Sequence, residues 1–383
     1  MTDDSHAEAE APPRHLLFWG TYDRNNARIR ILLSGLAENG VRVSEIHTDV
    51  WGGVWDKTQM TLWGRLWKFL RLLLAYPGLV IRFFTAPRPD AVVVGHPGHL
   101  DILMLQFPAA LRGIPIVWDM FLSAYDTLVL DRQMVKRGSF LAGLIHGLEG
   151  LVCRSASGIV MDTAAHAVFI RQEYDLSESH VGWAPVGAED LFFHQPIGQR
   201  PSDVPRSVLF YGKMIPLHGI STILEAAHMT AGEGISWTII GTGQEVAKVH
   251  AALAEGHVPG LQWRESVSYT DLPGLIDAAD ICLGVFGGSD KAGRVVPNKV
   301  YQALARGCPV ITRDSPAMRA LTAQMPGFVM MVPPESPQAL AVAIVEMLKA
   351  DRRDTVRARV PAGTFDGKAV ARQFSRVVEG SIR

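Results

Sequence analysis

The chain has 383 residues, 48% of them hydrophobic, and carries a formal net charge of −1 at pH 7. This length predicts two domains of ordinary size, each with its own core. The near-zero charge excludes a nucleic-acid protein that relies on a global positive field. Cys153, Cys282 and Cys308 stand singly in apolar stretches, which predicts reduced thiols and a cytoplasmic protein.

The first 14 residues are acidic and rich in Ala, and we expect them to be disordered. They lack an apolar core, so a signal peptide is not predicted there. No uninterrupted apolar run reaches about 18 residues, so a membrane-spanning helix is not expected.

The N-terminal half alternates apolar strands with amphipathic helices. HLLFWG (15–20) predicts a strand, a helix follows from Arg28 to Asn39, and RVSEIHT (42–48) predicts the next strand. This β–α–β opening indicates a parallel sheet. We expect one domain over 15–190 and a linker rich in Pro over 191–206. Further buried strands are predicted at 91–96, 115–120 and 158–163.

The C-terminal half, 207–360, repeats the pattern, and a last helix within 361–383 is expected to pack back on the N-terminal domain. The predicted fold class is therefore α/β, with two doubly wound Rossmann-like domains facing across a cleft. In such sheets the ligand binds at the carboxyl ends of the strands. Strands are predicted at 207–212, 236–241, 280–285, 309–312 and 328–333, and helices at 220–231, 244–254, 270–278, 298–306 and 336–349.

The stretch 284–312 carries the strongest functional signal. GGSDKAG (287–293) is predicted to be an irregular loop, and Pro297 and Asn298 begin a helix that buries Val300. A helix N-terminus presents unpaired N–H groups, so this loop is suited to bind an anion. Lys291, Arg294 and Lys299 crowd the same place, which predicts a diphosphate site.

A second glycine-containing loop, YGKMIPLHG (211–219), joins a strand to a helix. Lys213 and His218 lie five residues apart, while Gly212 and Gly219 allow close backbone approach. One interpretation is that the loop binds phosphate; the other is an ordinary turn with solvated side chains. Neither the Walker nor the Rossmann glycine pattern is present.

GTG (241–243) offers a third turn between a strand and a helix. Gly241 and Gly243 either line the cleft beside a nucleotide or form a tight structural turn.

The first strand ends in polar residues. Gly20, Thr21, Arg24 and Asn25 are candidates for contact with an acceptor or a phosphate. The alternative is a capped helix start with a solvated arginine.

GHPGHLD (95–101) and WDMFLSAYDT (118–127) follow two further strands. His96 and His99 are candidates to bind a sugar hydroxyl or move a proton, or else are structural histidines. A metal pair lacks a third ligand nearby, so no metal site is predicted. Asp119 and Asp126 either orient hydroxyl groups or cap helices.

Residues 62–84 interleave aromatic and basic side chains. This composition is typical of an interfacial helix on anionic lipid. It also fits a core helix whose basic groups reach outward to water. Both alternatives remain at this point, so peripheral contact with the inner face of the membrane is one expectation.

YGKMIPLHG followed by PNKVYQALARGCPVI (297–311) resembles the donor-binding half of GT-B glycosyltransferases, in particular the retaining family 4. VMDTAAHAVFI (160–170) and APVGAEDLFF (184–193) are similar to the end of such an N-terminal domain. The resemblance implies a nucleotide diphosphate sugar as donor, with no further cofactor. It also implies contacts from Lys213 and His218 to the diphosphate.

The chain departs from this family at four positions, one of which is His218 in place of the usual lysine. The two glutamates of its Glu-x7-Glu motif meet Arg294 and Gln302, and its N-domain histidine meets Phe121. Gln302 can still bind a ribose hydroxyl, and Arg294 is suited to phosphate. His96, His99 or Asp119 would then replace the missing histidine.

We therefore expect a retaining hexosyltransferase that acts without a metal, on a carbohydrate, lipid-linked or small-molecule acceptor. Its donor-binding residues are Gly212, Lys213, His218, Gly241, Gly243, Pro297, Asn298, Lys299, Val300 and Gln302. Two alternatives remain: a nucleotide-sugar 2-epimerase of the same fold, and a degenerate sugar-nucleotide binder that lacks catalysis.

Overall fold

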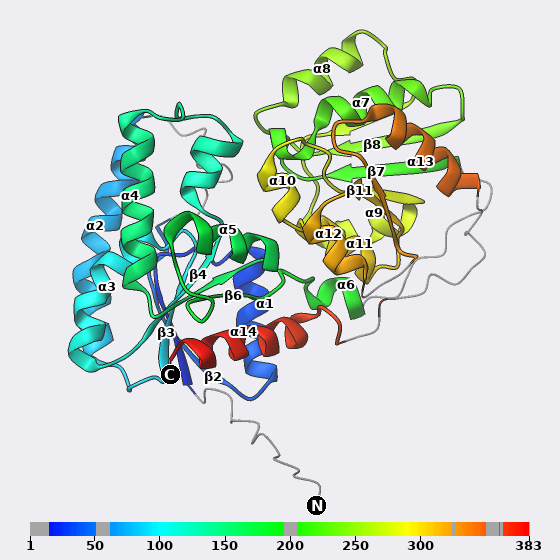
Figure 1. Cartoon of the computed structure of the whole chain (residues 1–383). Coiled ribbons are helices and arrows are strands. Elements are labelled where there is room, and N and C mark those ends of the chain that lie inside the picture. Colours follow the sequence, from blue (N-terminus) through cyan, green and yellow to red (C-terminus); the bar gives the residue numbers. More distant parts are fainter. Residues whose placement is uncertain are drawn as a thin grey trace, which may run out of the picture.

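The computed structural model describes residues 15–50, 62–194, 205–323, 327–349, 360 and 363–382. The expected disordered segment 1–14 lies outside this part of the chain. Two sheets of six strands each are ordered β2-β1-β3-β4-β5-β6 and β12-β11-β10-β7-β8-β9, and all their strand pairs are parallel. The prediction of two Rossmann-like α/β domains is confirmed (Figure 1).

The inner strands of the N-terminal sheet are buried on both faces, whereas the edge strand β2 is mostly half-buried or exposed. β3 reads AVVVG and all five of its residues are buried, as expected where helices cover both sides of a parallel sheet. The strands are β1 His15–Gly20, β2 Arg42–His47, β3 Ala91–Gly95, β4 Ile116–Phe121, β5 Gly158–Met161 and β6 Val181–Trp183. The helices between them are α1 Ala27–Glu38, α2 Leu62–Thr85, α3 His99–Arg112, the π-helical turn η2 Asp126–Asp131, α4 Phe140–Ser155 and α5 Ala164–Tyr174.

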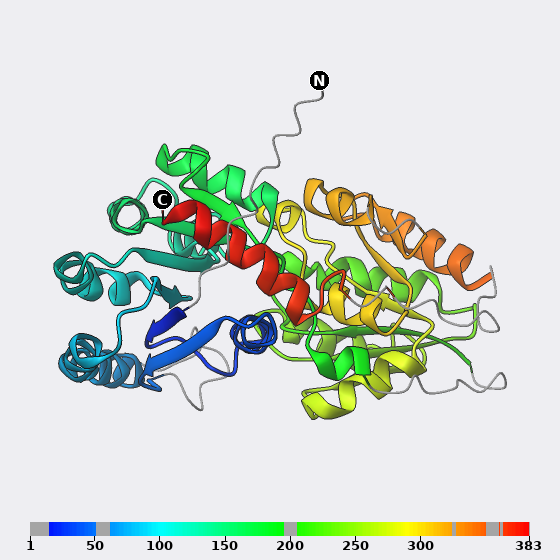
Figure 2. The same cartoon turned by 90° about the horizontal axis from the view of Figure 1, so that it is seen from below.

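Different helices cover the two faces of this sheet. One core lies between the sheet and α2, α3, α4 and α5, and a second core lies between the other face, α1 and α14 (Gly367–Ser381). A Cβ on Gly35 would lie 1.9 Å from the carbonyl oxygen of Gly367, so glycine is what lets α1 and α14 cross so closely. The last helix of the chain therefore packs on the N-terminal domain, as Figure 2 also shows.

The C-terminal domain repeats the architecture and contains elements that the sequence did not predict. β9, α10 and α12 were not expected, and part of the GGSDKAG segment forms the short helix α10. The strands are β7 Arg206–Tyr211, β8 Ile235–Ile240, β9 Leu261–Arg264, β10 Ile281–Leu283, β11 Val310–Arg313 and β12 Val329–Val332. The helices are η3 Pro216–His218, α7 Ile220–Met229, α8 Val246–Ala254, η4 Tyr269–Asp271, α9 Leu272–Ala278, α10 Asp290–Arg294, α11 Asn298–Ala305, α12 Pro316–Thr322 and α13 Pro337–Lys349.

The start of the expected linker is a helix. Asp190–His194 forms α6, and its Phe192 and Phe193 are buried in the core of the C-terminal domain. Residues 195–204 lie outside the described part. Each helix in the described part of the chain is too short or insufficiently apolar to span a bilayer.

Candidate functional site

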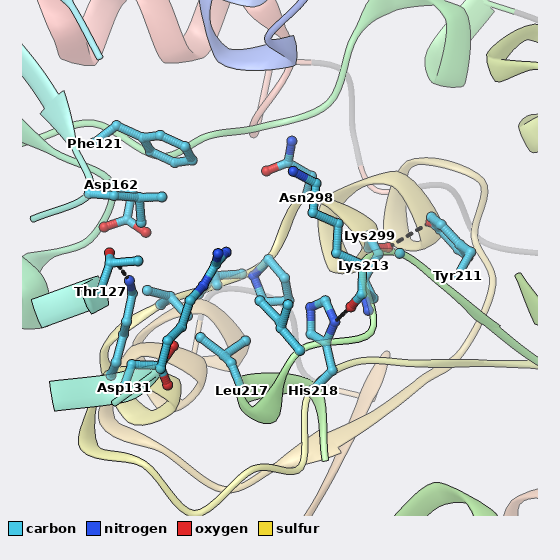
Figure 3. A pocket seen from close by; sticks show the side chains of 18 of the residues that line it. Phe121, Thr127, Asp131, Asp162, Tyr211, Lys213, Leu217, His218, Asn298 and Lys299 are labelled. Atoms are coloured by element: carbon cyan, nitrogen blue, oxygen red, sulfur yellow. Dashed lines mark hydrogen bonds between the residues drawn. The ribbon is translucent and has the colours of Figure 1, made fainter. Parts of the chain in front are cut away.

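A cavity of about 410 Å³ lies between the two domains. It is called the donor cavity below, after the sugar donor that the sequence predicts there. The carboxyl ends of β4, β5 and β7 all reach it, as the strand topology predicts. In Figure 3 side chains of the N-terminal domain face those of the C-terminal domain across this space. The lining residues are Phe121, Leu122, Thr127, Asp131, Arg132 and Asp162 from the first domain, and Tyr211, Gly212, Lys213, Ile215, Leu217, His218, Lys291, Val295, Val296, Pro297, Asn298, Lys299 and Gln302 from the second.

Two glycines shape the loop after β7. Gly212 has φ +138°, and a Cβ there would lie 3.1 Å from Nζ of Lys299. Gly219 has φ +67°, and a Cβ there would lie 2.8 Å from the backbone nitrogen of Gly287. The loop 212–219 is thereby packed against the 284–312 stretch, so the two predicted phosphate-binding segments lie side by side.

His218 is buried on the wall of the donor cavity. Its Nδ1 lies at the carbonyl oxygen of Lys213, and because a carbonyl only accepts, Nδ1 carries the proton. Burial lowers the pKa of His218 well below its ordinary value, and the nearby Lys299 lowers it further. The ring is therefore neutral, and its Nε2 is left as an acceptor.

Lys299 is a buried lysine without a counterion among the described residues. Its Nζ has no hydrogen-bond partner among the residues that the structure describes, and it lies 3.8 Å from the ring centroid of Phe210. Burial lowers the pKa of Lys299 well below that of a solvated lysine. A bound anion would supply the missing partner of this ammonium group.

The other predicted donor residues divide into two groups. Pro297, Asn298 and Gln302 line the donor cavity, and Nε2 of Gln302 donates to the Tyr269 hydroxyl over 3.0 Å. Val300 does not line it, because its side chain is fully buried in the core.

Gly241 and Gly243 do not line the donor cavity either. A Cβ on Gly241 would lie 1.9 Å from the carbonyl oxygen of Gly212, and one on Gly243 would lie 2.7 Å from the carbonyl oxygen of Met214. The GTG turn therefore packs against the backbone of residues 212–214 and does not contact the cavity itself.

One ion pair and two hydrogen bonds join α10 and its N-cap residue Ser289 to η2 across the domain interface. Nη2 of Arg294 lies 2.7 Å from Oδ1 of Asp126, and Oγ of Ser289 donates to Asp131 over 2.7 Å. Lys291 donates to the hydroxyl of Thr127. Burial lowers the pKa of Lys291 and raises that of Asp126, while their mutual attraction opposes both shifts.

Arg294 occupies a different place from the one predicted. It lines a second cavity of about 1180 Å³ and stacks on Phe169, with its Cζ 4.0 Å from the ring centroid. Its guanidinium group is neutralised by Asp126. The two cavities are neighbours, because Asp131 and Lys291 line both.

Asp162 lines the donor cavity and was not among the predicted site residues. It follows β5 directly, and its Oδ1 lies 2.8 Å from Nδ1 of His166, whose Nε2 lies 3.6 Å from Asp126. The available signal was its position directly after a buried strand. Asp131 and Arg132 were missed for lack of any motif.

Asp119 does not face the cavity, contrary to expectation. It is fully buried, and its Oδ1 lies 2.7 Å from Nη2 of Arg28, which is equally buried. His96 has Nδ1 3.0 Å from the carbonyl oxygen of Met120, and Nε2 of His99 lies 2.9 Å from Glu149. None of these three candidates lines either cavity.

The polar residues after β1 also serve the structure. The backbone nitrogen of Thr21 donates to Asp101 over 3.1 Å, and a Cβ on Gly20 would lie 2.7 Å from that carboxylate. Arg24 pairs with Glu45 over 2.7 Å, and the backbone nitrogen of Asn25 donates to its neighbour Asp23. None of them lines either cavity.

No group of three or more His, Cys, Asp or Glu side chains in the described residues is arranged to hold a metal ion.

Comparison with known proteins agrees with this architecture. Residues 205–350 match the family model described as glycosyl transferases group 1. The WcaI protein of Escherichia coli (strain K12), named as a colanic acid biosynthesis glycosyl transferase, is 28% identical over 180 residues, or 46% of this chain and 44% of WcaI. The aligned part thus spans less than half of that relative.

Solved structures match nearly the whole chain. Anabaena HepE in complex with UDP and glucose has a TM-score of 0.66 at 13% identity, covering 96% of this chain and 99% of HepE. Sucrose-phosphate synthase from Thermosynechococcus elongatus has a TM-score of 0.68 at 16% identity, covering 96% and 98%. The lipopolysaccharide outer core galactosyltransferase WaaB gives 0.60 at 14%, covering 95% and 99%. The GT-B fold, and with it the resemblance to GT-B glycosyltransferases, is confirmed.

Proposed function

We propose that the protein is a glycosyltransferase that moves a hexosyl group from a nucleotide diphosphate sugar to an acceptor. The observation that carries the proposal is the buried, unpartnered ammonium of Lys299 beside a neutral His218 on the wall of the donor cavity. A buried cation without a counterion destabilises the protein. The position of Lys299 on the wall of a cavity is explained if an anionic ligand binds there and pairs with its ammonium group.

The leaving diphosphate would be stabilised by fixed charges and backbone dipoles. Lys213, Lys299 and Lys291 line the donor cavity, and the N-terminus of α11 contributes unpaired N–H groups. Groups that are placed where negative charge develops act as electrostatic catalysts. We propose that they do the work that a divalent cation performs in metal-dependent transferases.

A carboxylate of the N-terminal domain would replace the glutamates that the C-terminal domain lacks. Asp162 lines the donor cavity and is held by His166, while Asp131 is held by Ser289. Glycosyl transfer passes through positive charge at the anomeric carbon, which a nearby carboxylate stabilises. We assign this role to Asp162. We propose retention of configuration on the basis of the resemblance to family 4.

UDP is the proposed nucleotide, because the similar HepE structures hold UDP and UDP-glucose. The acceptor is proposed to reach the second cavity, whose walls come from both domains.

A cytoplasmic location is supported by three cysteines that are buried and form no disulfide. The absence of both motif glutamates favours the second candidate function, a binder of sugar nucleotides without catalysis.

The test is release of UDP from a panel of UDP-sugars by the wild type and by Lys213→Ala, with Lys248→Ala as control. Lys213 is exposed on the loop after β7, so the substitution should leave the unfolding temperature unchanged. We expect turnover to fall by about 10²–10³-fold, as for removal of one oxyanion donor. Lys248 is exposed and pairs with Glu245, away from the cavities, so its substitution should have no effect.

Three outcomes contradict the proposal. Unchanged turnover by a folded Lys213→Ala protein would remove the phosphate-binding role of the loop. Conversion of the donor sugar without any acceptor would favour an epimerase. Tight binding of UDP-sugars without transfer or hydrolysis would favour the non-catalytic binder.

A further inference from the structure

Helices α2, α3 and α4 expose an apolar surface on the side away from the N-terminal sheet, called the α2–α4 face below. Trp63 is 80% exposed, Phe107 69% and Phe140 89%. Other large hydrophobic side chains on the three helices are also exposed. Within the described residues the C-terminal domain exposes large hydrophobic side chains only at scattered positions. The apolar exposure is thus concentrated on one part of one domain.

The three helices form a continuous surface. α3 contacts both α2 and α4, and Figures 1 and 2 show the three helices side by side on the same side of the N-terminal domain. Soluble monomers rarely expose an apolar patch larger than a few hundred Å². The core interpretation of 62–84 applies to one side of α2, which buries Leu72, Leu79 and Phe83 against the sheet, while its other side is exposed.

The charges on this face have a single sign. Arg71, Arg82 and Arg154 are exposed on α2 and α4. The acidic residues of the three helices are Asp101 and Glu149, and both are buried and hydrogen-bonded inside the domain. Aromatic and aliphatic side chains with only cations among them match an anionic lipid surface. A two-fold contact with a second copy would instead bring like charges together.

We propose that the α2–α4 face docks on a bilayer that contains anionic lipid. The aromatic side chains would enter the head-group region while the arginines pair with lipid phosphates. Docking is a surface association, because the helices keep their inner sides in the protein core.

The docked orientation would bring the second cavity to the lipid surface. Met134, Lys136 and Arg137 line that cavity, and they belong to the segment that leads directly into α4. If the cavity receives the acceptor, then the acceptor is an amphiphile held in the membrane. This consequence rests on the proposed function, whereas the docking itself does not.

The test is sedimentation with vesicles of phosphatidylcholine alone and of phosphatidylcholine mixed equally with phosphatidylglycerol. We expect the protein to bind the mixed vesicles more tightly, and to bind them less as salt increases. A triple variant, Trp63→Gln, Phe107→Gln and Phe140→Gln, should bind them at least about tenfold more weakly. All three side chains are exposed, so the variant should fold normally.

A matched control replaces exposed apolar side chains of the C-terminal domain. Met229→Gln, Leu253→Gln and Val342→Gln remove similar surface elsewhere and should leave vesicle binding unchanged. A charge variant, Arg71→Glu and Arg154→Glu, should lose the preference for phosphatidylglycerol.

UDP binding by each protein, measured by calorimetry, separates this proposal from the proposed function. If the triple variant of the α2–α4 face binds vesicles more weakly but still binds UDP, the docking surface is supported. If the wild type binds vesicles but not UDP, only the proposed function is contradicted. Equal binding of the face variant, the control and the wild type to the mixed vesicles would overturn the proposal. So would a dimer in solution that the face variant dissociates, with no binding to vesicles.

Discussion

Replacement of Lys299 by methionine should make the protein more stable and its binding of UDP weaker. The side chain is buried, its Nζ has no hydrogen-bond partner in the described part of the chain, and it lies over the Phe210 ring. Methionine has a similar length, is apolar and makes favourable contacts with aromatic rings. The substitution therefore removes a buried cation without leaving a large cavity.

The two effects have opposite signs and comparable sizes. An unsatisfied buried polar group costs about 1–3 kcal/mol, so the free energy of unfolding should rise by that amount. A charge-assisted hydrogen bond to phosphate contributes about 1.5–3 kcal/mol, so the Kd for UDP should rise roughly 10- to 150-fold. Since burial lowers the pKa of Lys299 in the folded state, the unfolded state binds more protons. Wild-type stability should therefore increase as pH rises toward the ordinary pKa of lysine, and the advantage of the variant should shrink.

The assay is a denaturant titration at several pH values together with calorimetric binding of UDP. Lys248→Met is the matched control, because Lys248 is about half exposed and pairs with Glu245 on the surface. A Lys299→Met protein that keeps wild-type affinity would place Lys299 outside the phosphate site. A variant that is less stable than the wild type would show that the ammonium group is satisfied in the folded protein.

Three more predictions concern His218, Asp119 and Arg294. Binding of UDP should be accompanied by proton uptake, because the pKa of His218 is lowered in the free protein and a bound anion raises that pKa. The affinity for UDP should therefore fall as pH rises. Calorimetry in buffers of different ionisation enthalpy measures the number of protons taken up. Asp119→Asn should destabilise the N-terminal domain by about 3–5 kcal/mol, since it leaves Arg28 buried and unpaired, while UDP affinity stays unchanged; denaturant titration checks the first part. Arg294→Gln should lower the rate of transfer without changing the affinity for UDP, because Arg294 pairs with Asp126 across the interface. If the variant instead binds UDP roughly tenfold more weakly, then Arg294 contacts the phosphate, as the sequence predicted.

The fold could be read from the sequence wherever strands are buried on both faces. Continuous apolar runs such as AVVVG identify them without any knowledge of their neighbours. β9 was missed because it is an edge strand, in which only Leu261 is buried and polar residues alternate with it. α12 was missed although Ser315 caps it and Pro316 begins it, because the helix is only 7 residues long.

The cavity lining from the C-terminal domain was more predictable than the lining from the N-terminal domain. Lys213, His218 and Lys299 lie on short segments in which glycines and a helix start define the backbone locally. By contrast, whether Asp119 or His99 faces a cavity depends on partners that are distant in the sequence. Arg28 lies 91 residues from Asp119, and Glu149 lies 50 residues from His99. No local pattern reports such pairing, so a buried ion pair and a catalytic carboxylate look alike in the sequence.

The departures from the family motif become consistent when both domains are considered together. Where the motif has its first glutamate, Arg294 holds Asp126 of the opposite domain, and Lys291 contacts Thr127 beside it. Asp126 and Asp131 of the N-terminal domain thus supply negative charge at this interface, where their contacts with Arg294 and Ser289 hold the two domains together. A diphosphate that enters the donor cavity would compete with Asp126 and Asp131 for the charge of Lys291, which lines both cavities. Donor binding should therefore loosen the interdomain contacts beside the second cavity, so that occupancy of one cavity affects access to the other.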